Sequence, residues 1–283
     1  TGEIMSTNYE KGFNNLPDLK NHPAGDYMGG DWPTKFNIIF DDFTSFDTAS
    51  NGWRAGTQGG STIALVPTSQ FDSRTANGVL RLTTSSSATG SAGSCLLAWA
   101  GGSGANRATI PFTGTEPFFF QIRYKYPANA TDCLLGFNVG TEALMTGSQY
   151  TGFQFMPPSF QTQFNPNSGS PAASFLRMKN AIVGAFGSLE GADEATVLDR
   201  YNVLTFYYDP KRKFMVYQIN DKRYDAAGTV RTNLDGQDLM LDTAGTIPFG
   251  SVMMPTIGLS GATSQSIDID YVMVGCQRPE ELF

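Results

Sequence analysis

The chain carries its clearest pattern in the stretch Phe118-Phe-Phe-Gln-Ile-Arg-Tyr-Lys-Tyr126. Successive side chains of a β-strand point to opposite faces, so residues two apart share a face. Large apolar or aromatic residues stand at every even position of this stretch, and polar residues stand between them at Gln121, Arg123 and Lys125. The alternation predicts a long strand in an antiparallel sheet with one buried face and one solvated face.

Short segments of the same kind recur along the chain, separated by clusters of Gly, Ser, Thr, Asn and Pro. No segment keeps a helical period, and residues 188–198 offer one or two helical turns at most. No internal repeat is present, which disfavours a propeller or a solenoid. Roughly a dozen strands without helices predict an all-β antiparallel β-sandwich. The other expected strands are 36–40, 79–83, 133–139, 153–156, 202–208, 214–219, 222–224, 253–259 and 267–274.

Composition limits the function classes. The 283 residues include 19 Lys and Arg against 26 Asp and Glu, giving a net charge of −7. A charged fraction of 16% with 12% aromatic residues argues against disorder. The acidic balance argues against nucleic acid and anionic membranes as partners, since both require fields of Lys and Arg. No apolar run approaches the ~18 residues of a membrane span, and we expect no signal peptide at the N-terminus.

The three cysteines, Cys95, Cys133 and Cys276, lie far apart in apolar surroundings. This odd, sparse set suits neither a disulfide framework nor a zinc site. We expect buried thiols that act as small hydrophobic groups. Asp41-Asp42 and Asp235-Gly-Gln-Asp238 could contribute to a calcium site, but Asx turns explain them more simply. We therefore expect no metal and no cofactor.

Residues 1–35 form a separate organisational unit. This stretch has neither a strand nor a helix period, and Pro and Gly punctuate it. It nevertheless carries many large apolar groups, which a flexible linker would not. We expect an extended irregular N-terminal arm over 1–35, lying either on its own domain or on a partner, followed by a sandwich domain over 36–283. The apolar residues of the arm are Phe13, Leu16, Leu19, Tyr27, Met28 and Trp32.

Catalytic machinery is hard to assemble from this sequence. The only histidine, His22, lies in the arm and not near a nucleophile motif, so a Ser/His/Asp or Cys/His set is not expected. A glycosidase needs two carboxylates flanking the scissile bond. Asp268 and Asp270 share a strand face about 7 Å apart, but no Glu accompanies them, and a solvated strand face or turn capping explains them as well. We expect no catalytic residue and no enzymatic activity.

Glycan binding is the main alternative kind of site. Trp53 and Trp99, with Tyr150 and Phe160 in loop contexts, could stack on sugar rings. Aromatic residues are plentiful here, however, and most of them must belong to the core.

Two stretches late in the chain resemble the concanavalin A-like (laminin-G-like) jelly roll. The first is Arg200-Tyr-Asn-Val-Leu-Thr-Phe-Tyr-Tyr-Asp209 followed by Phe214-Met-Val-Tyr-Gln-Ile-Asn-Asp-Lys222, where a strand ending in Tyr-Asp precedes a strand and a tight turn. The family has Asp-Gly-Lys at that turn, and here Asn220-Asp221-Lys222 lacks the glycine. The second is Ile267-Asp-Ile-Asp-Tyr-Val272, similar to the family's last strand. The resemblance covers about 36–276 and implies a jelly-roll sandwich.

The N-terminal stretches Gly12-Phe-Asn-Asn-Leu-Pro-Asp18, Asn21-His-Pro-Ala-Gly-Asp26 and Gly30-Asp-Trp-Pro-Thr34 lead to Phe40-Asp-Asp-Phe43. They resemble the arm of tailed-bacteriophage virion proteins. The resemblance implies a capsid decoration (cement) protein on the virion surface, bound to the major capsid protein and to neighbouring copies of itself as a homo-oligomer. The expected capsid contacts in the arm are Phe13, Leu16, His22, Tyr27 and Trp32.

The sequence is also compatible with other placements of the arm and with other functions. The arm could wrap its own sandwich and cover an edge strand. The protein could instead be a carbohydrate-binding virion module, such as a head fibre or host-adhesion domain, or a divergent polysaccharide hydrolase.

Overall fold

The computed structural model of the chain is built from antiparallel strands. The structure describes residues 35–46, 53–67, 78–85, 93–99, 115–125, 132–139, 150–156, 175–180, 184–188, 201–209, 214–220, 222–224, 230–231, 253–261 and 264–278. Within these ranges no helix is long and apolar enough to cross a membrane. The predicted arm, residues 1–34 in particular, and the predicted helical turns after residue 188 lie outside the described ranges.

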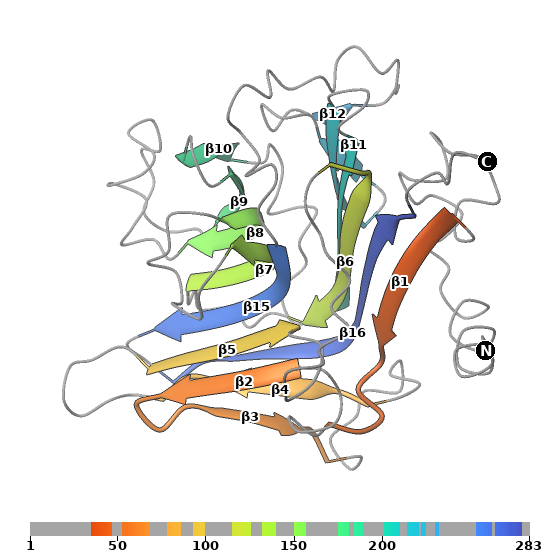
Figure 1. Ribbon diagram of the computed structural model, residues 1–283. Helices are drawn as coiled ribbons and strands as arrows, with labels where there is room; N and C mark the ends of the chain where they lie inside the picture. Colours follow the sequence, from red (N-terminus) through yellow and green to blue (C-terminus); the bar gives the residue numbers. More distant parts are fainter. Residues whose placement is uncertain are drawn as a thin grey trace, which may run out of the picture.

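The strands form two sheets that face each other (Figure 1). The nine-stranded sheet has the order β14-β13-β12-β11-β6-β16-β4-β3, and β1 also pairs with β16. Its strands are β1 (Phe36–Asp41), β3 (Thr62–Leu65), β4 (Leu80–Thr83), β6 (Phe118–Lys125), β11 (Tyr201–Asp209), β12 (Phe214–Ile219), β13 (Lys222–Tyr224), β14 (Val230–Arg231) and β16 (Ser266–Gln277).

The seven-stranded sheet has the order β10-β9-β8-β7-β15-β5-β2. Its strands are β2 (Trp53–Gln58), β5 (Gly93–Trp99), β7 (Asp132–Val139), β8 (Tyr150–Met156), β9 (Phe175–Asn180), β10 (Gly184–Ser188) and β15 (Met253–Gly261). The described strand pairs are antiparallel in both sheets. The prediction of an all-β antiparallel sandwich is therefore confirmed.

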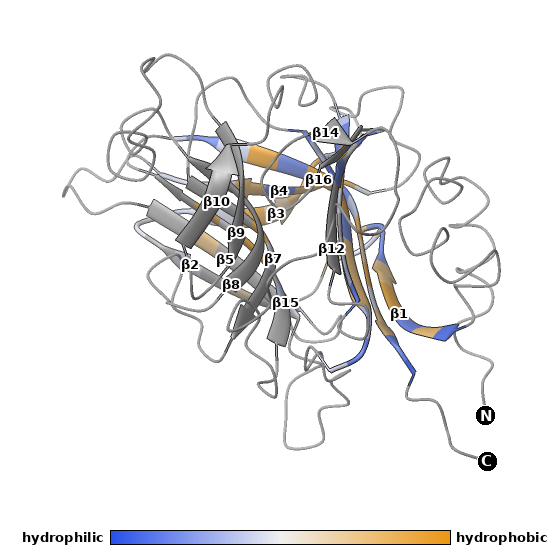
Figure 2. Ribbon diagram, turned by 90° about the horizontal axis from the view of Figure 1, so that it is seen from above, coloured by the Kyte–Doolittle hydropathy of each residue, from blue (hydrophilic) through white to orange (hydrophobic). Residues whose placement is uncertain are grey.

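Strand β16 is the central strand of the nine-stranded sheet. One edge pairs with β6 along most of its length. The other edge pairs first with β4, from Ser266 to Ile269, and then with β1, from Val272 to Gln277. The register against β6 shifts between Ile269 and Tyr271, which makes Asp270 the extra residue of a β-bulge. In Figure 2 hydrophobic residues run along β1, which lies beside the second half of β16.

The core between the sheets is apolar and closely packed. From the nine-stranded sheet it takes Leu80, Leu82, Ile122, Tyr124, Leu204, Ile267 and Ile269, all inaccessible to solvent. Cys95 of β5 reaches across from the other sheet, and its single S–H group lies within donating distance of the carbonyl oxygens of Thr83 (3.2 Å) and Thr62 (3.4 Å). Burial raises the pKa of Cys95, and burial also raises that of Cys276 to about 11. The prediction of buried cysteines is confirmed for these two residues, and the side chain of Cys133 lies outside the described part.

The prediction of one solvated face along β6 is only partly correct. Lys125 and Arg123 are half-exposed, but Gln121 is 1% exposed and Phe119 is fully buried. The amide of Gln121 donates to the hydroxyl of Thr205 at 2.9 Å, which compensates for its lost contact with water. Both faces of this half of the sheet are thus withdrawn from solvent. The alternation in the sequence identified the two faces correctly, but it did not show that the polar face is buried at its start, as far as Gln121.

Several strands were missed by sequence analysis. β2, β3 and β5 contain Gly, Ser or Ala at positions where a buried strand usually has larger groups, and β3 is only four residues long. Between β2 and β3 the chain crosses from one sheet to the other through Gly59 and Gly60, which have φ of 66° and 82°. Only residues that tolerate positive φ suit such a turn.

A close contact at Gly275 generates a stability prediction. A Cβ added to Gly275 would overlap Cε1 of Phe119, the residue directly opposite it on β6. We expect Gly275→Ala to destabilise the fold by about 1–3 kcal/mol through overpacking. Urea unfolding of the full chain measures this. Phe119→Leu in the same chain should recover part of the loss, because the two changes meet at one contact. A Gly275→Ala protein as stable as the wild type contradicts this packing.

Candidate functional site

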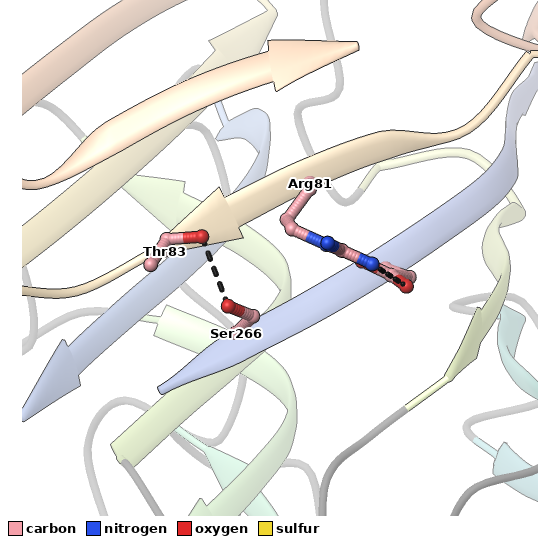
Figure 3. Close-up of polar contacts among 4 residues, drawn as sticks. Arg81, Thr83 and Ser266 are labelled. Carbon is pink, nitrogen blue, oxygen red and sulfur yellow. Dashed lines mark hydrogen bonds and ion pairs between the residues drawn. The ribbon is translucent and has the colours of Figure 1, made fainter. Parts of the chain in front are cut away.

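A polar ladder crosses the outer surface of the nine-stranded sheet. Arg81 of β4 stands directly opposite Asp268 of β16. Its Nε and Nη2 donate to the two carboxylate oxygens at 2.6 and 2.8 Å, a bidentate geometry (Figure 3). The Asp268 side chain is 16% exposed and that of Arg81 38%. Hydrogen bonding to Asp268 raises the pKa of Arg81 above its ordinary value. The pair therefore presents a fixed carboxylate and guanidinium at the surface.

Two hydroxyl groups lie next to this ion pair. Thr83 and Ser266 stand opposite each other, and their Oγ1 and Oγ atoms are 2.9 Å apart (Figure 3). Each hydroxyl can donate one hydrogen bond and accept others. Because both residues are half-exposed, the pair retains capacity for an external partner.

The ladder continues across β6 to β11. Lys125 stands opposite Asp268 in the strand register, on the side away from Arg81, and Tyr201 stands opposite Lys125. Directly paired residues of antiparallel strands share a face, so this row carries a cation, an anion, a second cation and an aromatic ring. Both Lys125 and Tyr201 are half-exposed. We call the following six residues the polar face: Arg81, Thr83, Lys125, Tyr201, Ser266 and Asp268.

The bulge beside the polar face holds a second ion pair. Arg123 Nη1 donates to Oδ2 of Asp270, and the guanidinium carbon of Arg123 also lies 4.7 Å from the ring centre of Tyr201. Burial raises the pKa of Asp270, while the charge and hydrogen bond of Arg123 oppose that rise. Arg123 thus links the buried carboxylate to the aromatic ring of the polar face and restricts how that ring is oriented.

Trp53 is not the glycan-stacking residue that the sequence suggested. It is fully buried, 6.2 Å from the ring of Phe43, and its indole N–H donates to Oδ2 of Asp41 at 2.8 Å. The other oxygen of Asp41 accepts the N–H of Phe43 at 2.8 Å, an Asx turn in which Phe43 has a φ of 50°. Sequence alone could not separate an exposed tryptophan in a Gly-rich context from one that anchors the core.

The structure describes only some of the other residues that the sequence suggested for glycan or metal binding. Trp99 lies opposite Trp53 in β5, and Tyr150 begins β8, but their side chains lie outside the described part of the structure, as does all of Phe160. Asp41 has the Asx-turn role expected of it, while Asp235 and Asp238 fall outside the described ranges. In the residues that the structure describes, no group of three His, Cys, Asp or Glu could hold a metal ion.

The expected capsid-contact residues Phe13, Leu16, His22, Tyr27 and Trp32 also lie outside the described ranges. Asp268 and Asp270, considered above as a glycosidase pair, are each paired with a different arginine. The β-bulge at Asp270 could not be predicted from the sequence, because Ile267-Asp-Ile-Asp-Tyr-Val272 alternates as a regular strand would.

No family model matches the sequence, and no curated protein matches it. Solved structures do match the fold. Peanut lectin superimposes with a TM-score of 0.53 at 12% identity, over 84% of this chain and 97% of the lectin. The acidic lectin of winged bean, solved with methyl-α-D-galactose, superimposes with a TM-score of 0.52 at 14% identity, over 86% of this chain and 100% of the lectin. The sandwich therefore has a concanavalin A-like jelly-roll fold, as the closing strands indicated.

Burial of Asp270 predicts a distinctive pH dependence. Its pKa in the folded chain lies above the ordinary value of 3.8, so the folded state binds this proton more tightly than the unfolded state does. The contribution of Asp270 to stability is therefore full below about pH 3.8 and is lost as pH rises through the folded pKa. Asp270→Asn removes the pH-dependent contribution of Asp270 to the free energy of unfolding. The contribution of the buried Asp41 carboxyl is the same in both proteins, so it cancels when the two are compared.

Urea unfolding of both proteins from pH 4 to pH 7 measures the effect. The free energy of unfolding of Asp270→Asn, relative to the wild type, should rise as pH rises. A difference that stays constant or falls over this range would show that burial does not dominate at Asp270.

Proposed function

We propose that this protein is a carbohydrate-binding module that holds a saccharide on the polar face. The observation that carries the proposal is the Asp268 carboxylate, fixed by two hydrogen bonds from Arg81 beside the paired hydroxyls of Thr83 and Ser266 on a half-exposed sheet surface. Sugar hydroxyl groups donate to carboxylates and accept from cationic side chains. Prepositioned groups of this kind lower the entropy cost of ordering side chains on binding.

The aromatic residue of the polar face supplies the complementary contact. A sugar ring has an apolar face of C–H groups that can pack on a tyrosine ring, and Tyr phenol adds a polar end. Tyr201 of β11 stands next to Lys125 of β6, which in turn stands next to Asp268 of β16. A saccharide lying along this row would meet a ring, an ammonium group and a carboxylate in succession.

The similarity to lectins supports the proposal. The winged bean structure contains methyl-α-D-galactose, and this chain shares its fold across the whole length of that lectin. At 14% identity the likeness concerns the fold, so we assign the polar face from its own chemistry and not from the position of that sugar.

We propose binding without hydrolysis. A glycosidase needs an acid and a second carboxylate that both reach the glycosidic bond. Asp270 is 6% exposed and hydrogen-bonded to Arg123, and Asp268 is held by Arg81. Neither carboxyl is presented as a free acid to a bound chain.

A glycan array screened with the full chain tests the proposal, followed by titration calorimetry with the best saccharide. Hydrogen bonds to charged groups contribute about 1.5–3 kcal/mol, so Asp268→Asn should weaken binding roughly tenfold or more. Tyr201→Ala should weaken it as well. Asn37→Ala, at an exposed position of β1, is the control and should bind like the wild type. Absence of any bound glycan, or unchanged affinity in both variants, contradicts the proposal.

A second candidate function is that of a capsid decoration protein of a tailed bacteriophage, located on the virion surface. The observation in its favour is the N-terminal sequence, with His22, Tyr27 and Trp32 among Pro and Gly residues, which resembles the arm of such proteins. The two functions are compatible, since a decoration protein can also carry a carbohydrate-binding domain.

Deletion of residues 1–34 tests the second candidate. Lys35 is kept because its carbonyl oxygen accepts the backbone N–H of Arg278 at 2.9 Å, which ties the start of β1 to the end of β16. The truncated protein should retain its thermal transition and lose co-sedimentation with capsid shells. Full shell binding by the truncated protein would refute the role of the arm.

A further inference from the structure

Among the described strands, β3 ends the nine-stranded sheet with one edge unpaired, and the residues of this edge lack the usual protection. It pairs with β4, and no other described strand pairs with its opposite edge. Natural edge strands are commonly protected by a charge, a proline or a bulge. The sequence Thr62-Ile-Ala-Leu65 contains neither a charged residue nor a proline, and its register against β4 has no bulge.

The edge ends in an exposed apolar residue that belongs to a core row. Leu65 is opposite Leu80, which in turn is opposite Ile269, and both of these partners are fully buried. Leu65 itself is 39% exposed, the only exposed large hydrophobic side chain among the described residues. The apolar row therefore runs from the core to the rim of the sheet, where a further strand would cover it.

The backbone groups that point outward can be identified from the hydrogen bonds. Val66 N–H donates to Val79 O at 2.8 Å, which makes 66 and 79 a hydrogen-bonded pair. Bonded and non-bonded pairs alternate in an antiparallel ladder, so Thr62 and Ala64 also bond to β4. The N–H and C=O groups of Ile63 and Leu65 must then point away from β4. The bond from Thr84 N–H to Gln265 O agrees with this alternation, because it directs the backbone groups of Thr84 toward β16 and away from β3.

We propose that β3 pairs with β3 of a second copy of this chain about a two-fold axis through Ala64. This register places Ile63 opposite Leu65 of the other copy, and Leu65 opposite Ile63. Each of these is a hydrogen-bonded pair between outward-pointing groups, and each puts two apolar side chains on the core-facing side. The proposal does not depend on what the polar face binds.

Neighbouring registers are less suitable. Moving the axis to Ile63 would place Leu65 opposite Ser61, a buried residue whose hydroxyl already accepts the N–H of Ser85. Moving it to Leu65 would place Ile63 opposite Pro67, which has no N–H to donate. The sequence of the edge is thus self-complementary about Ala64, which favours a second copy over an unrelated strand as its occupant.

A cysteine cross-link tests both the contact and its register. Two residues at the axis form a non-bonded pair with Cα atoms about 4.5 Å apart, within the range of about 4.4–6.8 Å that a disulfide spans. Ala64 lies on the outer face and is exposed, so Ala64→Cys should not disturb the core. On mild oxidation the full-length variant should form a disulfide-linked dimer on a non-reducing gel.

Thr62→Cys is the matched control. Thr62 is exposed on the same face of the same strand, but in the proposed register it lies opposite Val66 of the other copy, and not opposite itself. It should remain uncross-linked. A dimer linked through position 62, or no dimer at position 64, overturns the proposal.

Sedimentation velocity of the unmodified chain provides an independent measurement. The wild type should show a dimer that dissociates on dilution. Leu65→Lys should raise the dimer dissociation constant at least tenfold, and Asn37→Lys, an equal charge change at the opposite end of β16, should leave it unchanged. Unaltered circular dichroism will show that both variants fold. A monomer at every concentration, or a dimer indifferent to Leu65→Lys, also overturns the proposal.

Discussion

The pairing of β16 on both of its edges is the constraint on which this structure depends. A buried strand must satisfy its backbone N–H and C=O groups, since each group left unpaired away from water costs free energy. β16 meets this requirement with β6 on one side and with β4 and β1 in succession on the other. The first described strand and the last are thereby joined, and the backbone bond between Lys35 and Arg278 extends this pairing.

The bulge at Asp270 divides β16 into two environments. Before it, Asp268 lies in a half-exposed row with Arg81 and Lys125. Beyond it, Met273 and Gly275 lie on the outer face and are buried, so that both faces of the sheet are withdrawn from solvent there. The extra residue also directs a carboxylate at Arg123, which contacts Tyr201. One irregularity in one strand therefore separates the half-exposed polar face from the part of the sheet that is buried on both faces.

Much of the fold could be predicted from sequence, because strong alternation identifies strands that have one polar face. Phe118–Lys125 and Phe214–Ile219 were predicted within a residue, and the resemblance of 200–222 and 267–272 to the concanavalin A-like jelly roll indicated the correct fold. Short strands without large side chains were missed, as with Thr62–Leu65. Their positions are determined by pairing with distant segments, which a local pattern does not encode.

The site was harder to predict than the fold. Trp53 was considered, under the alternative of glycan binding, as a residue that stacks on sugars, and it instead anchors the core through Asp41. Lys125 was recognised as a polar position of its strand, but its placement beside Asp268, with Arg81 on the other side, depends on three strands that are widely separated in sequence. Only the register of β4, β16, β6 and β11 brings these side chains into one row.

A crystal structure of the full chain with a bound saccharide would test the central claim most directly. The account predicts a sugar on the outer surface of the nine-stranded sheet, with a hydroxyl group donating to Asp268 and the ring packed on Tyr201. A sugar bound only to the seven-stranded sheet, with the polar face unoccupied, would contradict it.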